Sequence, residues 1–255
     1  MALMTINLHA ETLDLQTAVN VLIPDKLAAG KPPATLYLLH GLSGDYSSWL
    51  LKTSLLRYAE NRQLTIIMPS AERSFYTNMV HGNRYWSYLT EELPAKLGSW
   101  LPLTQNRENC FVGGLSMGGY GALKWGLSAP DKFAGILSMS AAVDLAALLE
   151  RSPEYRDDFE SIFGNPLSFP HSDNDLFHLV DKVSDQDHPM PEILQFCGNA
   201  DFLYTDNLRF KAKLDASRIP HSFHEKEATG HEWAYWDESI QIGLDWIEQK
   251  IALQN

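Results

Sequence analysis

The chain has 255 residues, of which 45% are hydrophobic and 20% are charged, and its formal net charge is −12. This length and composition are typical of a globular α/β protein with a large core, and no run approaches the roughly 18 apolar residues of a membrane-spanning helix. The acidic balance argues against binding to nucleic acid or to an anionic membrane surface, because both attract clustered lysine and arginine.

The first half of the chain alternates between strand-like and helix-like patterns. Short continuous apolar runs indicate strands buried on both faces, and apolar residues three and four apart indicate helices. The predicted elements are, in order, an antiparallel pair of edge strands within 3–23, a strand at 34–40, a helix over 47–62, a strand at 64–69 and a helix over 85–100 that continues through Pro94.

The alternation continues in the second half. The predicted elements are a strand at 110–113, a helix over 119–127, strands at 133–139, 193–197 and 222–226, and a long amphipathic helix over 232–252. Strands that alternate with helices predict a mostly parallel central sheet with helices on both faces. We therefore expect one α/β domain over residues 1–255.

Residues 141–190 interrupt this rhythm. They contain helix-like pieces at 143–149, 153–163 and 173–183 but no convincing strand. An insertion at this point would lie above the carboxyl ends of the strands, so we interpret it as a small helical lid over a site. A longer surface connection is the alternative.

Gly114-Leu115-Ser116-Met117-Gly118 is a G-x-S-x-G motif between a predicted strand and a predicted helix. Strand, sharp turn and helix are the context of a nucleophile elbow, in which a strained turn exposes the serine hydroxyl at a helix amino terminus. The helix dipole and free N–H groups there favour developing negative charge. We predict Ser116 as a nucleophile.

A serine nucleophile needs a base and a third group that orients the base. In proteins whose serine lies in a nucleophile elbow, these residues occur along the chain in the order serine, acid, histidine. His231 follows the last strand and precedes the last helix, which is the position from which a base can reach the elbow. The other late histidines lie either in or beside a strand or in the predicted lid: His221, His224, His171, His178 and His188.

The acid is expected after the strand at 193–197. Asp201 is the first carboxylate beyond its carboxyl end, and Asp206 is the alternative, although we expect it to be a solvated charge on the next helix. An oxyanion would need N–H donors. We predict these at Met117 and at Leu42, with Gly41 as the alternative to Leu42, and we expect the ring of His40 to brace this loop.

Four segments in this order resemble the esterase D branch of α/β-hydrolases, and within it the bacterial tributyrin-esterase group: His40-Gly41-Leu42-Ser43-Gly44, the elbow, Gly198-Asn199-Ala200-Asp201 and Gly230-His231-Glu232-Trp233. The resemblance implies an α/β-hydrolase fold. It also implies a serine carboxylesterase that acts on small esters through Ser116, Asp201 and His231.

The same branch includes S-formylglutathione hydrolases, cinnamoyl or feruloyl esterases and mycolyltransferases. The chain has Ser43-Gly44-Asp45 where the formylglutathione hydrolases carry a cysteine-containing segment. An acyltransferase on the same fold, and a non-catalytic ligand-binding protein, are the remaining alternatives.

Few other residues point to a separate function. The two cysteines, Cys110 and Cys197, lie in apolar runs and are expected to be buried free thiols. No cofactor motif or metal-ligand spacing is found, so a small-molecule ester is the only partner that we predict, and a homo-oligomer stays open. No signal peptide is recognised, and a cytoplasmic location is expected.

Trp233 is a candidate for the pocket, and Phe159 and Phe163 would either line the acyl site or pack within the lid.

Overall fold

Eight strands form one sheet in the order β1-β2-β4-β3-β5-β6-β7-β8. The structure is a computed structural model, and it describes the chain except for residues 28–30, 166–168, 185–188 and 254–255. The strands are β1 (Ala2–Ala10), β2 (Leu15–Ile23), β3 (Ala34–Leu39), β4 (Leu64–Pro69), β5 (Cys110–Leu115), β6 (Gly135–Met139), β7 (Glu192–Gly198) and β8 (His221–Lys226).

Strands β1 and β2 pair antiparallel, β2 pairs antiparallel with β4, and every other pairing is parallel. This confirms the predicted edge pair and the mostly parallel sheet. The chain runs from β3 to β4 on one side and then returns to β5 on the other side of β3. In open parallel sheets such a reversal leaves a crevice at the carboxyl ends of the two central strands, where ligands bind.

Ten α-helices are present in the described part of the chain. They are α1 (Ser48–Lys52), α2 (Leu55–Ala59), α3 (Tyr85–Ser87), α4 (Leu93–Trp100), α5 (Met117–Ser128), α6 (Leu145–Arg151), α7 (Arg156–Phe163), α8 (Leu176–Ser184), α9 (Tyr204–Asp215) and α10 (Trp233–Ala252). One π-helical turn (Tyr88–Glu92) and two 3₁₀ turns (Arg107–Asn109 and Pro153–Tyr155) complete the helical segments. Within these ranges no helix has the length and apolar character needed to cross a membrane.

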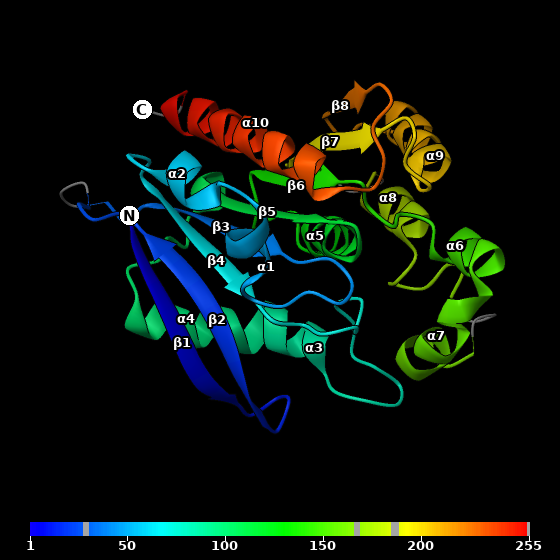
Figure 1. The fold of residues 1–255 in the computed structure, drawn as a ribbon, viewed down its shortest axis with the longest axis horizontal. Coiled ribbons are helices and arrows are strands. Elements are labelled where there is room, and N and C mark those ends of the chain that lie inside the picture. The colour runs from blue at the N-terminus through cyan, green and yellow to red at the C-terminus, as the bar shows by residue number, and fades with distance from the viewer. Residues whose placement is uncertain (28–30, 166–168, 185–188, 254–255) are drawn as a thin grey trace.

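The helices cover both faces of the sheet, as Figure 1 shows: α1, α2 and α10 lie on one face, and α4 and α5 on the other. Alternate residues of β3 supply the two cores. Leu36 and Leu38 pack with Trp236 and Ile240 of α10, whereas Leu39 belongs to the core under α5. A strand buried on both faces therefore needs apolar residues at every position, which is the pattern that predicted it.

The helix expected over 47–62 is two short helices. The break falls between Thr53 and Ser54, where the backbone of Thr53 is extended. The hydroxyl of Thr53 donates to the carbonyl of Trp49, and the N–H of Ser54 donates to Asp237 Oδ1 on α10 at 2.6 Å. The contact with a distant helix replaces the helical hydrogen bond at this position.

The helix expected over 85–100 is also interrupted. Tyr88–Glu92 form a π-helical turn, after which Pro94 stands in the first turn of α4. Proline has no N–H and its ring crowds the carbonyl four residues earlier, so a helix accommodates it best in a first turn. The wider turn before Leu93 makes that possible without ending the helical path.

Helices α6, α7 and α8 lie in the described part of the segment 141–190. No strand occurs in the part of this segment that the structure describes. Figure 1 shows α6 and α7 beyond the carboxyl ends of the strands, at the right of the view. Helix α8 packs against α5, so the segment is connected to the body of the molecule at that helix.

Candidate active site

Ser116 occupies a strained turn between β5 and α5. Its backbone has φ 53° and ψ −117°, a combination that residues with a side chain seldom adopt. Hydrogen bonds from both sides hold it: the N–H of Ser116 donates to Met139 O at 2.9 Å, and its carbonyl accepts from Tyr120 N at 3.0 Å and from Ala142 N at 3.2 Å. The surrounding structure therefore imposes the strain on the serine.

The two glycines of the motif let the turn pack closely. A Cβ on Gly114 would lie 2.4 Å from the backbone of Gly118, and a Cβ on Gly118 would lie 2.4 Å from the carbonyl oxygen of Leu39. Backbone atoms cannot move aside as a flexible side chain can. The predicted elbow is present, and its glycines are required by contacts between three backbone segments.

His231 lies between Ser116 and Asp201. The hydroxyl of Ser116 is 3.0 Å from Nε2 of His231, and Nδ1 is 2.9 Å from Oδ2 of Asp201. An N–H at Nδ1 that donates to the carboxylate leaves the lone pair of Nε2 free to accept from the serine hydroxyl. The loops that carry the acid and the histidine are joined by a hydrogen bond from Ala200 N to Thr229 O at 3.0 Å.

The alternative residues that the structure describes have other partners. Asp206 lies in the first turn of α9, but the prediction of a solvated charge is wrong: the residue is 1% exposed and pairs with two arginines. His221 contacts Asp215 at 3.0 Å, and the ring of His224 stacks on Phe196. His171 packs against His178 in the segment 141–190, and His188 lies outside the described residues.

Leu42 lies in a tight turn beside Ser116. The turn is closed by a hydrogen bond from Gly44 N to Gly41 O at 3.1 Å, and Ser43 has φ 64°. This bond does not use the N–H of Leu42. Met117 is the first residue of α5, where backbone N–H groups have no acceptor within the helix. Both predicted donors are thus on backbone segments that adjoin the serine.

His40 braces this turn, as predicted. Its Nδ1–H donates to Gly41 O at 2.7 Å, and its Nε2 accepts from Ala71 N at 2.9 Å. The ring is 1% exposed, and burial lowers the pKa of His40 below its ordinary value. A neutral ring with one donor and one acceptor satisfies both contacts. The hydroxyl of Tyr76 adds a third bond, to the carbonyl of His40 at 2.9 Å.

A cleft of about 400 Å³ opens at Ser116. Its two walls come from the two cores of the molecule. Residues of the core under α5 and the segment 141–190 form one wall: Leu42, Phe75, Ala142, Leu148, Tyr155 and Leu203. Residues of the core under α1 and α10 contribute to the other wall: Leu115, Trp233 and Trp236. The volume lies at the small end of the range for ligand sites.

The structure decides the roles of three aromatic residues that the sequence left open. Trp233 lines the cleft and packs edge-on against Trp49 and Trp236. Phe159 and Phe163 do not line the cleft. They pack behind it against Phe75, with ring centroids 5.4 and 6.3 Å away.

Two residues beside His231 were not predicted as part of the site. The rings of Phe202 and Trp236 each lie 4.8 Å from the imidazole, centroid to centroid. The indole N–H of Trp236 donates to Ser140 Oγ at 3.2 Å, which fixes its orientation. The place of Phe202 directly after Asp201 is a signal that could have indicated its role.

Cys110 and Cys197 are buried free thiols, as predicted. Burial raises the pKa of Cys110 to about 11, so this thiol stays protonated at neutral pH. Over the residues that the structure describes, no three histidine, cysteine, aspartate or glutamate side chains are placed to hold a metal ion.

Comparison with known proteins identifies the family. The family model described as "Putative esterase" matches residues 10–247, which is most of the chain. The chain belongs to this esterase family. A relative named acetyl esterase, from Caldicellulosiruptor saccharolyticus, is 31% identical in an alignment of 264 positions that covers 98% of this chain and 99% of the relative.

Two similar structures come from Staphylococcus aureus. The fluorophosphonate-binding serine hydrolase FphF shares 35% identity with a TM-score of 0.89, over 96% of this chain and 98% of that protein. The S-formylglutathione hydrolase FrmB shares 34% identity with a TM-score of 0.86, over the same shares of the two chains. The chain is thus a carboxylic ester hydrolase with the α/β-hydrolase fold, as predicted.

Proposed function

We propose that this esterase is a serine carboxylesterase that hydrolyses short-chain acyl esters through an acyl-enzyme. The observation that carries the proposal is the pair of contacts on His231: 3.0 Å to the Ser116 hydroxyl and 2.9 Å to the Asp201 carboxylate. A histidine held between a hydroxyl and a carboxylate is the arrangement that activates a serine nucleophile.

In the proposed mechanism, His231 takes the proton of Ser116 as the hydroxyl attacks the ester carbonyl. The N–H groups of Leu42 and Met117 stabilise the oxyanion, aided by the amino terminus of α5. Asp201 orients the imidazole and stabilises the imidazolium. His231 then protonates the leaving alcohol, and water hydrolyses the acyl-enzyme with His231 again as the base.

The four substituents of the tetrahedral carbon indicate which part of the cleft each group of the ester occupies. Ser116 Oγ forms one bond, the oxyanion faces Leu42 and Met117, and the leaving oxygen must face Nε2 of His231. Leu42 takes up one end of the first wall, so we assign the acyl group to the rest of that wall, which contains Ala142 and Leu148. A cleft of about 400 Å³ and the similarity to a protein named acetyl esterase both favour short acyl chains.

Labelling with a fluorophosphonate tests the proposal directly, since one similar structure is described as fluorophosphonate-binding. We expect labelling of the native protein and none of Ser116→Ala, whose kcat on 4-nitrophenyl acetate should fall by about a millionfold. Ser99→Ala, at an exposed position on α4, is the control. Labelling that persists in Ser116→Ala would contradict the assignment of the nucleophile.

Thioester hydrolysis is a second candidate, because FrmB shares 34% identity with this chain. Comparing S-formylglutathione, tributyrin and methyl ferulate as substrates distinguishes it from tributyrin-esterase and feruloyl-esterase activity. Acyl transfer would be recognised by formation of a new ester when an alcohol is added. A lid role for residues 141–190, a cytoplasmic location and the absence of a cofactor are further parts of the proposal.

A further inference from the structure

Helix α6 contributes to the wall of the cleft that we assign to the acyl group. Leu148 is 4% exposed and lines the cleft with Ala142, which precedes α6, and with Leu203, which precedes α9. The position of α6 relative to α9 therefore determines the space available between Leu148 and Leu203.

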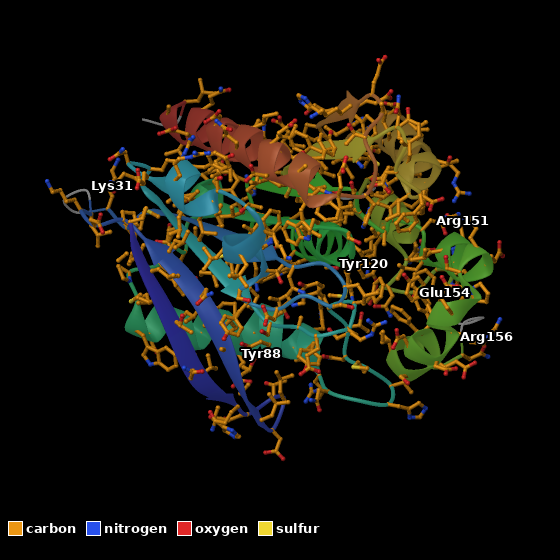
Figure 2. The ribbon with its side chains drawn as sticks, viewed as in Figure 1. Lys31, Tyr88, Tyr120, Arg151, Glu154 and Arg156 are labelled. Carbon is orange, nitrogen blue, oxygen red and sulfur yellow. The ribbon has the colours of Figure 1, made fainter. Side chains whose placement is uncertain are left out.

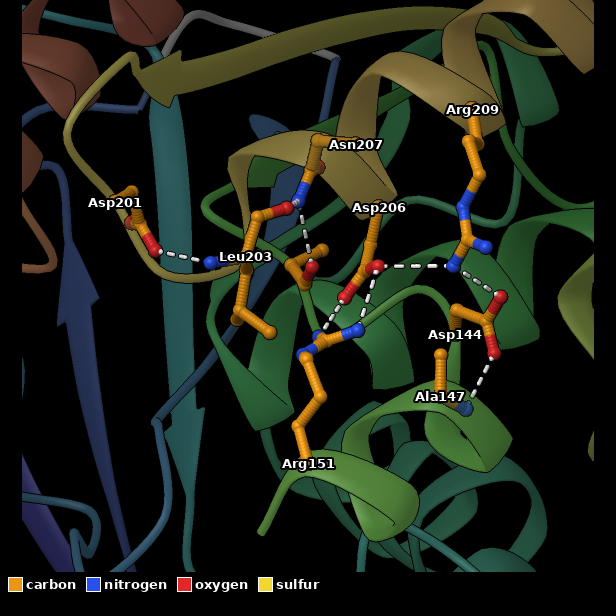
Figure 3. Close-up of polar contacts among 9 residues, drawn as sticks. Asp144, Ala147, Arg151, Asp201, Leu203, Asp206, Asn207 and Arg209 are labelled. Atoms are coloured by element: carbon orange, nitrogen blue, oxygen red, sulfur yellow. Dashed lines mark hydrogen bonds and ion pairs between the residues drawn. The ribbon is translucent and has the colours of Figure 1, made fainter.

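A buried carboxylate ties α6 to α9. Asp206, in the first turn of α9, is 1% exposed. Arg151, the last residue of α6, contacts both of its oxygens: Nη1 lies 3.2 Å from Oδ1, and Nη2 pairs with Oδ2 (Figure 3). Such a two-point pair fixes orientation as well as distance. Arg209 also donates to Asp206 Oδ1, at 2.9 Å.

The network reaches the other end of α6 through Asp144. One oxygen of Asp144 caps the helix by accepting from Ala147 N at 2.9 Å. The other accepts from Arg209 Nη2 at 2.7 Å, as Figure 3 shows. Both ends of α6 are thus connected to α9.

The same turn of α9 is connected to the catalytic acid. Asn207 Nδ2 donates to the carbonyls of Ala141 and Leu203, each at 2.9 Å. The N–H of Leu203 donates to Asp201 Oδ1 at 2.9 Å. The first turn of α9 therefore contacts both the cleft wall and the loop that carries Asp201.

We propose that the Arg151–Asp206 ion pair is a latch that fixes α6 against α9 and so sets the longest acyl chain that the cleft accepts. Arg151 and Asp206 are positioning residues, since neither lines the cleft. A pocket discriminates between acyl chain lengths only while its wall resists displacement. If the wall moves aside, an extra methylene meets no steric penalty and the longer chain is accepted. The inference rests on the proposed function, from which the acyl side of the cleft is assigned.

The test is Arg151→Met, with Arg156→Met as the matched control. Both arginines lie on the neighbouring helices α6 and α7, where Figure 2 labels them, and both are exposed. The measurement is kcat/KM for 4-nitrophenyl esters from acetyl to octanoyl. We expect Arg151→Met to raise the ratio of hexanoyl to acetyl turnover by about fivefold, which corresponds to about 1 kcal/mol. Arg156→Met should leave the ratio within about twofold of the native value.

A second variant and a count of active sites distinguish the effect of the ion pair from a loss of folding. Arg151→Lys keeps the charge but cannot make the two parallel hydrogen bonds, so it should give an intermediate ratio. Titration of Ser116 with a fluorophosphonate counts the folded, active molecules in each sample, and rates are expressed per labelled site.

An unchanged ratio in Arg151→Met and Arg151→Lys would overturn the latch, as would an equal change in Arg156→Met. Acetate esters of alcohols of increasing length are measured alongside: a change in Arg151→Met that follows the alcohol length, with no response to the acyl length, would overturn the assignment of this wall. Failure of the proposed function gives a different result: the native protein would hydrolyse none of the esters and Ser116 would not be labelled.

Discussion

Asp201 and His231 meet at 2.9 Å, and the carboxylate that makes this contact is fully buried. Its second oxygen accepts the N–H of Leu203, also at 2.9 Å. Each oxygen of Asp201 therefore has one donor, which leaves the side chain no freedom to turn. The imidazole is held in the orientation that presents Nε2 to Ser116.

Asp201→Asn is expected to lower kcat by about 10⁴-fold while leaving the circular dichroism spectrum unchanged. The amide fills the same space, but it can present an N–H to Nδ1, which favours the wrong tautomer and cannot stabilise an imidazolium.

Asp206→Asn provides the comparison, because Asp206 is the other candidate for the acid. We expect it to reduce turnover of 4-nitrophenyl acetate by no more than about tenfold, since Asp206 does not contact His231. A larger loss in Asp206→Asn than in Asp201→Asn would mean that Asp206 is the acid.

Gly118→Ala should destabilise the fold strongly. The new Cβ would lie 2.4 Å from the carbonyl oxygen of Leu39 and 2.6 Å from that of His40. We expect a loss of at least about 3 kcal/mol in the free energy of unfolding, measured in urea. Gly98→Ala on α4 is the control. A Cβ added at Gly98 would have its nearest neighbour, on Gln105, 3.6 Å away. Alanine should therefore be neutral there or stabilise the helix by up to about 1 kcal/mol. Equal effects of the two variants would contradict this explanation.

Lys124 should make stability depend on pH. This residue of α5 is 3% exposed, and burial lowers its pKa to about 7. Between that value and the ordinary value of 10.5, the unfolded chain holds a proton that the folded chain has released, so folding becomes more favourable as the pH rises. The slope from this group is about 1.4 kcal/mol per pH unit.

Lys124→Met removes this contribution. The melting temperature of the variant minus that of the native protein should be largest near pH 6 and should decrease toward pH 9. Lys182→Met serves as the control because Lys182 is half exposed and paired with Asp173. A difference that stays constant from pH 6 to 9 would show that the Lys124 ammonium is not penalised by burial.

Substrate size should be limited to short acyl chains. We expect kcat/KM on 4-nitrophenyl esters to peak between acetyl and butyryl and to fall steeply by octanoyl, since a methylene beyond the end of a pocket meets steric resistance. A flat profile up to decanoyl would rule out a closed acyl pocket.

Phe159→Ala and Phe163→Ala should move this optimum toward longer chains by an indirect route. Both rings support Phe75, which lines the cleft, so their removal gives Phe75 room to withdraw. Phe75→Ala should have the larger effect on chain length. If only the variants of Phe159 and Phe163 changed the profile, the acyl chain would have to pass between these rings.

Local patterns in the sequence were sufficient for most of the sheet. Strands β3 to β7 are buried on both faces, so continuous apolar runs indicated them without knowledge of their partners. The elbow was equally predictable, because the glycines that let its backbone segments pack closely lie within five residues of Ser116. The order of the motifs along the chain placed Asp201 and His231 at the same edge of a parallel sheet.

Contacts between distant segments decided the rest. The helix over 47–62 breaks at Ser54 because Asp237, 183 residues later, accepts its N–H. Asp206 is buried because Arg151 and Arg209 neutralise it, and no pattern around Asp206 reveals that pairing. Periodicity reports only which face of an element is apolar. The tertiary structure alone decides which polar groups meet across elements, since those pairs form only after the elements have packed.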